Sequence, residues 1–468
     1  MVFSGIVFLY YFLPCVFLAY FVVPQKLKNI ILLLASLFFY AWGEPVYVLL
    51  MLFSVLICYY AGIMIEKASE RQQRLFNSKN VLICAITLFT CIFIFFKYTD
   101  FIIANINAAV GREFPLRHIV LPIGISFYTF QIISYLVDVY RRDVPAQRNF
   151  LSLALYICMF PQLIAGPIVR YSAVATQLSD RKSTWEMVET GISRFIFGLS
   201  KKVLIANELG KLCDIFCESK ELSVLYYWLY AVAFSCHIYF DFSGYSDMAI
   251  GLGRIFGFVF PENFNYPYIS KSITEFWRRW HMSLGTWFRD YLYIPLGGNR
   301  TSKIRWYRNI LLVWLLTGLW HGASWNFVVW GLYFAVFLIL EKSWLLKKLN
   351  KLKIINHLYP VLLLIISFVI FNAESLSAAI LDLQNMFGMG EIPFYSKETG
   401  YQLRNYGFTI VIAMIGSTPL AAVMGKKLQN AAPKASAVIK ILLLFLLMLL
   451  STAYLVSGSF NPFLYFRF

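Results

Sequence analysis

Apolar residues fill this chain in long runs that short polar segments separate. Many runs approach the length of about 20 residues that an α-helix needs to cross roughly 30 Å of hydrocarbon. The pattern therefore predicts an all-α polytopic membrane protein, with about eleven transmembrane helices. Since several runs are too short or too polar for a full crossing, we also expect re-entrant and interfacial helices. The runs lie near residues 5–23, 29–42, 46–64, 80–97, 119–140, 151–169, 188–208, 223–241, 243–258, 308–320, 325–341, 357–372, 406–424 and 439–457.

Composition agrees with a membrane protein and removes other classes. Of the 468 residues, 60% are hydrophobic and 14% are charged, against about 25% charged in soluble domains. The net charge of +17 suits loops that face anionic membrane lipid, so we expect lipid and not nucleic acid as the partner of these cations. The eight cysteines are scattered through apolar runs, and we expect neither a metal site nor a bound cofactor.

The positions of the basic residues predict an orientation. Lys26 and Lys28 follow the first apolar run, and Lys67 and Lys79 lie between the third and fourth runs. Cytoplasmic loops carry an excess of Lys and Arg, so both loops are expected in the cytoplasm and the N-terminus outside. The first run has no basic segment before it and no small-residue cleavage pattern after it, which favours a span over a removed signal peptide.

Two short polar clusters interrupt the apolar background. Residues 160–167, FPQLIAGP, contain two prolines and a glycine, which should break or kink a helix there, either as a plain structural kink or as part of a site. Residues 240–247, DFSGYSD after Phe240, place Asp241 and Asp247 between two apolar runs. This second cluster is either a loop at the water interface or the lining of a cavity.

The third cluster is the densest in charge. Between Lys271 and Arg308 eight basic residues and two acidic residues alternate with aromatic side chains. One interpretation is an amphipathic interfacial helix whose arginines meet lipid phosphate. The other is a binding surface for an anionic cytoplasmic substrate such as a nucleotide-bearing thioester. The residues alone leave both interpretations open.

His321 is the histidine whose position is most informative. The surrounding apolar stretch, 309–340, is too short for two full crossings of about 20 residues each, so His321 is expected well inside the bilayer. A titratable imidazole at that depth indicates a cavity, because polar groups in a membrane need a partner or water. Its near-neutral pKa as a free side chain suits a general base for a hydroxyl nucleophile, although a packing role for a lone membrane histidine is also common.

Taken together, these motifs resemble the membrane-bound O-acyltransferase superfamily, and in particular its bacterial alginate O-acetylation branch. The resemblance extends over nearly the whole chain and depends on several independent motifs in order. The matching segments are FPQLIAGP at 160–167, DFSGYSDMAIG at 241–251, WRRWHMSL at 277–284, WFRDY at 287–291, PLGGNR at 295–300 and WHG at 320–322.

The resemblance implies a single integral membrane domain over residues 1–468, built around a central tunnel, with a motif-rich catalytic region at 160–342. It implies that His321 is the active residue and that His281 matches a second histidine position. Further residues are carried over as candidates for shaping the tunnel and binding substrate: Asp241, Tyr245, Asp247, Arg289, Asp290, Asn299 and Trp320.

The resemblance also implies a reaction. We expect acetyl transfer from a cytoplasmic thioester, acetyl-CoA or another, for O-acetylation of a cell-surface or exopolysaccharide. Systems that the chain resembles use a separate extracytoplasmic partner for the final transfer to the polysaccharide, and we see no esterase-like segment in the sequence. The resemblance therefore implies a partner of the SGNH acetyltransferase type or another polysaccharide-modifying protein. It also implies a location in the bacterial cytoplasmic membrane. The alternatives are D-alanyl transfer to teichoic acid, peptidoglycan O-acetylation and, from a different class, a transporter or flippase.

Overall fold

The computed structural model describes residues 1–71, 77–164, 166–349, 351–458 and 463, and every regular element in this part of the chain is helical. The chain divides into two compact units. Unit 1 comprises residues 1–195 and 248–261, and unit 2 comprises residues 196–247 and 262–468. Because every regular element that the structure describes is helical, the expectation of an all-helical polytopic fold is confirmed. The single domain over residues 1–468 stays a prediction.

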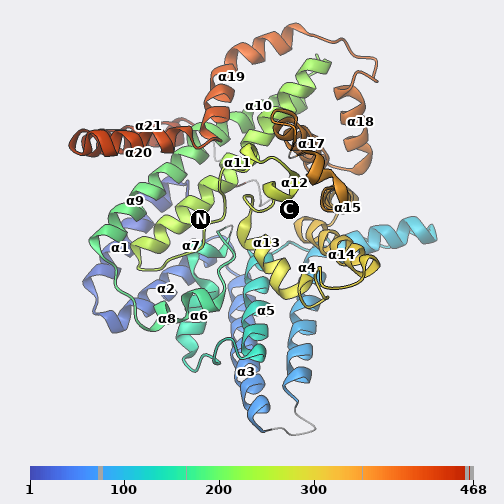
Figure 1. The fold of residues 1–468 in the computed structure, drawn as a ribbon. Coiled ribbons are helices and arrows are strands. Elements are labelled where there is room, and N and C mark those ends of the chain that lie inside the picture. Colours follow the sequence, from blue (N-terminus) through green and yellow to red (C-terminus); the bar gives the residue numbers. More distant parts are fainter. Residues whose placement is uncertain (72–76, 165, 350, 459–462, 464–468) are drawn as a thin grey trace. The chain divides into compact units, whose positions relative to one another are not determined.

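Unit 1 is an assembly of apolar helices. Its longest members, α3 and α4, run side by side and both pack against α5 (Figure 1). Asn77 begins α4 by accepting a hydrogen bond from the backbone N–H of Lys79, and Gly111 with φ +66° ends it. The helices of unit 1 are η1 (Phe8–Phe12), α1 (Leu13–Val22), η2 (Gln25–Leu27), α2 (Lys28–Ala41), α3 (Tyr47–Arg71), α4 (Ser78–Val110), α5 (Ile125–Arg141), α6 (Phe150–Cys158), α7 (Phe160–Leu163), α8 (Tyr171–Ser179) and most of α9 (Trp185–Ser200).

Unit 2 holds the motif segments between residues 277 and 322 together with the C-terminal helices, whereas the FPQLIAGP segment at 160–167 lies in unit 1 (Figure 1). Its core is rich in aromatic side chains, among them Trp280, Trp330 and Phe368. Its helices are η3 (Lys201–Ala206), α10 (Asn207–Glu218), most of α11 (Val224–Ile255), η4 (Pro267–Ile269), α12 (Ile273–Phe276), α13 (Met282–Phe288), η5 (Arg289–Tyr293), α14 (Lys303–His321), α15 (Trp325–Leu340), η6 (Glu341–Leu345), α16 (Leu346–Leu349), α17 (Ile355–Asn372), α18 (Leu376–Met386), α19 (Lys397–Gly416), α20 (Leu420–Ala431) and α21 (Pro433–Ser457).

Several helices are long and apolar enough to cross a membrane. Within the described residues five pass a test of length and hydropathy, and up to six pass if the bent pair α19 and α20 forms one span. The five are Tyr47–Ser69, Ser78–Val110, Trp325–Leu349, Ile355–Asn372 and Pro433–Ser457. These helices support a multi-pass protein, and the count of eleven spans stays a prediction.

The helix boundaries show how the first two polar clusters fold. The chain does break at the first cluster: α6 ends at Cys158, α7 has four residues, and the next helix in the described part of the chain begins at Tyr171. The second cluster is not a loop, because residues 240–247 lie inside the single 32-residue helix α11. The interruption in hydropathy at Asp241 is an ion-paired position on a continuous helix, as described below.

Helices α14 and α15 form a tight antiparallel hairpin that presents His321 at its turn. Gly318 and Gly331 permit this close approach: a methyl group on Gly318 would collide with the backbone oxygen of Phe327, and one on Gly331 with that of Trp314. Glycine at such positions lets two helix backbones meet without intervening side chains. The hairpin therefore fixes the position of His321 relative to α15.

Candidate active site

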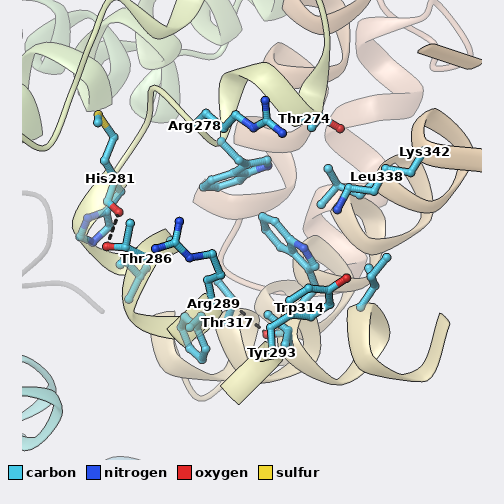
Figure 2. A pocket seen from close by; sticks show the side chains of 17 residues that line it. Thr274, Arg278, His281, Thr286, Arg289, Tyr293, Trp314, Thr317, Leu338 and Lys342 are labelled. Carbon is cyan, nitrogen blue, oxygen red and sulfur yellow. Dashed lines mark hydrogen bonds between the residues drawn. The ribbon is translucent and has the colours of Figure 1, made fainter. Parts of the chain in front are cut away.

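The third polar cluster surrounds a cavity in unit 2. The segment folds as three short helices, α12, α13 and η5, and not as one continuous amphipathic helix. The cavity has a volume of about 570 Å³. Figure 2 shows side chains from these helices and from α14, α15 and η6 around it. It is lined by Thr274, Trp277, Arg278, His281, Met282, Leu284, Gly285, Thr286, Phe288, Arg289, Tyr293, Ile310, Val313, Trp314, Thr317, Leu338 and Lys342.

The cavity combines positive charge with aromatic surface. Arg278, Arg289 and Lys342 are cations in its wall, and among the described residues no carboxylate side chain lines it. Trp277 and Trp314 add indole rings whose centroids are 4.7 Å apart. A concave site with few polar groups on an apolar lining is typical of small-molecule binding. This arrangement therefore suits an anionic ligand with an apolar arm.

His281 is the predicted histidine that reaches this cavity. It is 1% exposed, and it stands at the N-terminal boundary of α13 with φ 43° and ψ 51°. A non-glycine residue in this left-handed region is uncommon and is often found at functional sites. Burial lowers the pKa of His281 to about 3, so the imidazole is neutral at physiological pH.

His321 is surrounded by aromatic side chains, an aromatic cage of Trp320, Trp330 and Phe371, and does not line the cavity. It is the last residue of α14 and is 5% exposed. Its ring centroid lies 5.0 Å from those of Trp320 and Trp330, and 5.3 Å from that of Phe371. Thr317, which precedes it by one helical turn, lines the cavity, whereas His321 does not. The predicted active residue is thus one helical turn from a residue of the cavity wall and packs against the indole rings of Trp320 and Trp330.

A buried carboxylate anchors the start of the cluster. Glu341 is 1% exposed and accepts hydrogen bonds from the backbone N–H groups of Ile273 and Thr274, at 2.6 and 2.8 Å. It also accepts one from the hydroxyl of Thr274 at 2.6 Å. An anion at a helix start satisfies N–H groups that have no partner within the helix. Glu341 was not predicted, because its spacing from α12 in the sequence carries no motif.

The two aspartates of the second cluster form ion pairs with consecutive lysines. Asp241 pairs with Lys202, and both side chains are 2% exposed or less. Asp247 pairs with Lys201 at 2.7 Å in a more exposed position. Neither aspartate lines the cavity. Neither lysine was predicted, since both lie on η3, outside the motifs that carry the resemblance.

The remaining predicted residues are divided between the cavity and its surroundings. Arg289 lines the cavity, and its Nε donates a hydrogen bond to Asp290 at 2.6 Å. Tyr245 is buried on α11, Trp320 is buried on α14, and Asn299 is exposed in the turn before α14. The structure brings His281 and Arg289 into one wall, places Trp320 next to His321, and leaves Tyr245 and Asn299 outside the cavity.

Comparison with known proteins identifies the family. The sequence model of the membrane-bound O-acyltransferase family matches residues 37–348, more than half of the chain. The chain belongs to this family. It is therefore an enzyme, a membrane-bound O-acyltransferase with several membrane helices, and the transporter alternative loses its support.

Individual relatives of this O-acyltransferase come from several bacteria. It is 39% identical to the protein named "Probable alginate O-acetylase AlgI" of Azotobacter vinelandii over the full length of both chains. It is 35% identical to the peptidoglycan O-acetyltransferase of Helicobacter pylori, covering 84% of this chain and 81% of the relative. It is 32% identical to the teichoic acid D-alanyltransferase of Bacillus subtilis, covering 47% and 59%.

Proposed function

We propose that this O-acyltransferase moves an acetyl group from a cytoplasmic acyl thioester, such as acetyl-CoA, for O-acetylation of a polysaccharide outside the cell. The full-length similarity to a protein named as an alginate O-acetylase supports the acetyl group and the polysaccharide. The more limited match to the D-alanyltransferase makes D-alanyl transfer the weaker alternative. The protein is proposed to lie in the bacterial cytoplasmic membrane, with its N-terminus outside the cell.

The observation that carries this proposal is the composition of the cavity wall. Arg278, Arg289 and Lys342 offer charged donors to phosphate groups, and charge-assisted hydrogen bonds to phosphate are stronger than neutral ones. The indoles of Trp277 and Trp314 offer apolar surface to a flexible arm. A thioester carried on a phosphate-bearing arm has both properties, with its acyl end directed toward the histidines.

His321 is proposed as the general base of the transfer. The imidazole would take the proton of an acceptor hydroxyl while that oxygen attacks the thioester carbonyl. A new ester C–O bond forms, the C–S bond breaks, and the released thiolate takes up a proton. The acceptor is a glycan hydroxyl or a Ser or Thr side chain of a partner. Asp241, Tyr245, Asp247, Asp290, Asn299 and Trp320 are proposed to act through the shape of the path to this base.

Final transfer to the polymer is proposed to need a separate extracytoplasmic partner of the SGNH acetyltransferase type. The acyl group would pass the membrane at the histidines, while the bulky donor stays in the cytoplasm. Arg289 and the other cations of the wall would hold that donor on its own side.

The test compares acyl esters on cell-surface glycans in a deletion strain that carries wild type, His321→Ala or His357→Ala. His357 lies on α17, outside the cavity wall, and so provides a histidine control. We expect wild type and His357→Ala to restore O-acetyl esters, and His321→Ala to restore none at equal membrane abundance. Full restoration by His321→Ala would remove His321 as the base.

Peptidoglycan O-acetylation is a second candidate, because the Helicobacter pylori relative covers most of both chains. Separating the polysaccharide and peptidoglycan fractions before ester analysis distinguishes the two. Acetyl esters lost from peptidoglycan alone would assign the second function, and D-alanyl esters lost from teichoic acid would assign the third.

A further inference from the structure

The side-chain amide of Asn263 has only one orientation that its neighbours allow. Its Oδ1 lies 3.2 Å from the backbone N–H of Ser283 and 2.8 Å from the Ser283 hydroxyl. A backbone N–H can only donate, so the amide atom that faces it must be the oxygen. Asn263 is 1% exposed, and this contact holds its side chain in place in the core.

The same oxygen determines the tautomer of His281. The Nδ1 of His281 lies 3.1 Å from Oδ1 of Asn263. An amide oxygen carries no proton, so the hydrogen bond requires the proton on Nδ1. In a neutral imidazole the other nitrogen, Nε2, then carries a lone pair and no proton. The ring is neutral at physiological pH because burial lowers the pKa of His281.

Nε2 of His281 is an acceptor that nothing in the described part of the chain satisfies. The atom is buried and has no hydrogen-bond partner there, while His281 lines the cavity (Figure 2). A buried acceptor without a partner is unfavourable, unless a ligand or water supplies the donor. The backbone reinforces this arrangement, because the oxygen of Asn263 accepts the N–H of Met282 at 3.0 Å. Asn263 therefore contacts the His281 ring through its side chain and the backbone next to His281 through its own backbone oxygen.

We propose that Asn263 is a positioning residue: it fixes His281 as the Nδ1–H tautomer and leaves Nε2 as the cavity's hydrogen-bond acceptor for an amide N–H of the acyl donor. This inference rests on the proposed function, since it takes the occupant to be a thioester on an amide-bearing arm. It gives His281 a role in binding that is distinct from the base role of His321.

The first experiment reads the tautomer directly and does not depend on activity. The full-length protein with ¹⁵N-labelled histidine, in lipid nanodiscs, is studied by solid-state NMR, and His281→Gln assigns the signal among five histidines. We expect a protonated Nδ1 and a bare Nε2 in wild type and in Ser283→Ala, because that variant loses the hydroxyl but keeps the backbone N–H that orients the Asn263 amide. Asn263→Leu should lose the single tautomer. A protonated Nε2 in wild type would overturn the proposal.

A second variant covers the case in which Asn263→Leu does not fold. Asn263→Asp keeps an acceptor oxygen at Nδ1, but its charge favours imidazolium, so Nε2 should gain its proton at a higher pH than in wild type. The charged groups that line the same cavity, Arg278, Arg289 and Lys342, are present in wild type and in the variant alike, so the difference between the two titrations reports the new carboxylate. An unchanged titration of His281 in Asn263→Asp would show that the two side chains are not in contact.

The third measurement tests the ligand. Binding of a non-hydrolysable thioether analogue of acetyl-CoA is followed by calorimetry. We expect about a five- to tenfold weaker affinity for His281→Gln and Asn263→Leu, the size of one lost hydrogen bond, and wild-type affinity for Ser283→Ala. Equal affinity in all four proteins would overturn the binding role. Absence of binding to wild type, with the tautomer as expected, would reject the proposed donor and leave the tautomer assignment standing.

Discussion

The ring of His281 lies 6.1 Å from the ring of Trp320, the residue that immediately precedes His321 on α14. Trp320 in turn contacts His321 at 5.0 Å. Two histidines from separate motifs thus share one indole as a neighbour, although only His281 reaches the cavity. The Trp320 indole therefore links the two histidines through ring contacts on both of its sides.

Arg278 and Arg279 provide a matched pair for testing the anionic ligand. Arg278 lines the cavity, whereas Arg279 is bound to Glu275 at 2.9 Å and to the backbone oxygen of Asn265 at 3.1 Å. We expect Arg278→Gln to raise KM for the thioester donor by at least about tenfold with little change in kcat, since a charged hydrogen bond contributes about 1.5–3 kcal/mol. Arg279→Gln removes the same charge and should change KM less than threefold.

Donor kinetics at two salt concentrations check this prediction. Added salt screens exposed charges, so the difference between wild type and Arg278→Gln should narrow. Equal KM values for the two variants would argue against phosphate binding in this cavity.

The pair Lys202–Asp241 should be sensitive to the loss of either partner. Both side chains are almost fully buried, and breaking such a pair leaves an uncompensated charge that costs about 3–5 kcal/mol. We expect Lys202→Met and Asp241→Leu each to lower thermal stability in detergent strongly. The double variant should recover part of this loss, because no buried charge remains.

The neighbouring pair Lys201–Asp247 is the control. It is partly exposed, and exposed ion pairs contribute only about 0–1 kcal/mol. Lys201→Met should therefore change the melting temperature far less than Lys202→Met. Equal losses would contradict the difference in burial between the two pairs.

Glu341 should be required for the shape of the cavity wall. Glu341→Ala leaves the N–H groups of Ile273 and Thr274 without their acceptor, at about 1–3 kcal/mol for a buried group. We expect reduced stability together with weaker binding of the thioether analogue. Glu341→Gln keeps one acceptor oxygen and should retain more of both properties. Melting curves and calorimetry on the same preparations measure the two effects.

Gly318 should tolerate no side chain. Gly318→Ala places a methyl group against the backbone oxygen of Phe327, and overpacking of this kind costs about 1–3 kcal/mol or more. Gly425 on α20 has open space around it, so Gly425→Ala should be neutral or stabilising by up to about 1 kcal/mol. Thermal unfolding of both variants checks the difference, and similar effects would contradict the tight hairpin.

The hydropathy pattern predicted the helical fold because a membrane-spanning helix is recognised from one local property, the length of an apolar run relative to the membrane thickness. The prolines and glycine of residues 160–167 likewise predicted a break that the structure contains. The pattern could not reveal that α11 is continuous through Asp241. The charge there is neutralised by Lys202, which is distant in sequence and on another helix.

The site was predictable only in part for the same reason. The family resemblance singled out His281 and Arg289, and both line the cavity. Asn263 and Glu341 act through hydrogen bonds to backbone groups of distant segments, and such contacts leave no periodic or compositional signal. Their partners become visible only once the chain is folded.

The contact between Gly318 and Gly331 also limits how this sequence can change over time. A clash between two side chains can be relieved by a smaller residue at the contacting position, so a substitution at one core position can be compensated at another. Here each glycine faces backbone atoms, and no smaller residue exists. No substitution of a neighbouring side chain can therefore compensate for a side chain at either position, and the hairpin keeps its spacing only while both residues remain glycine.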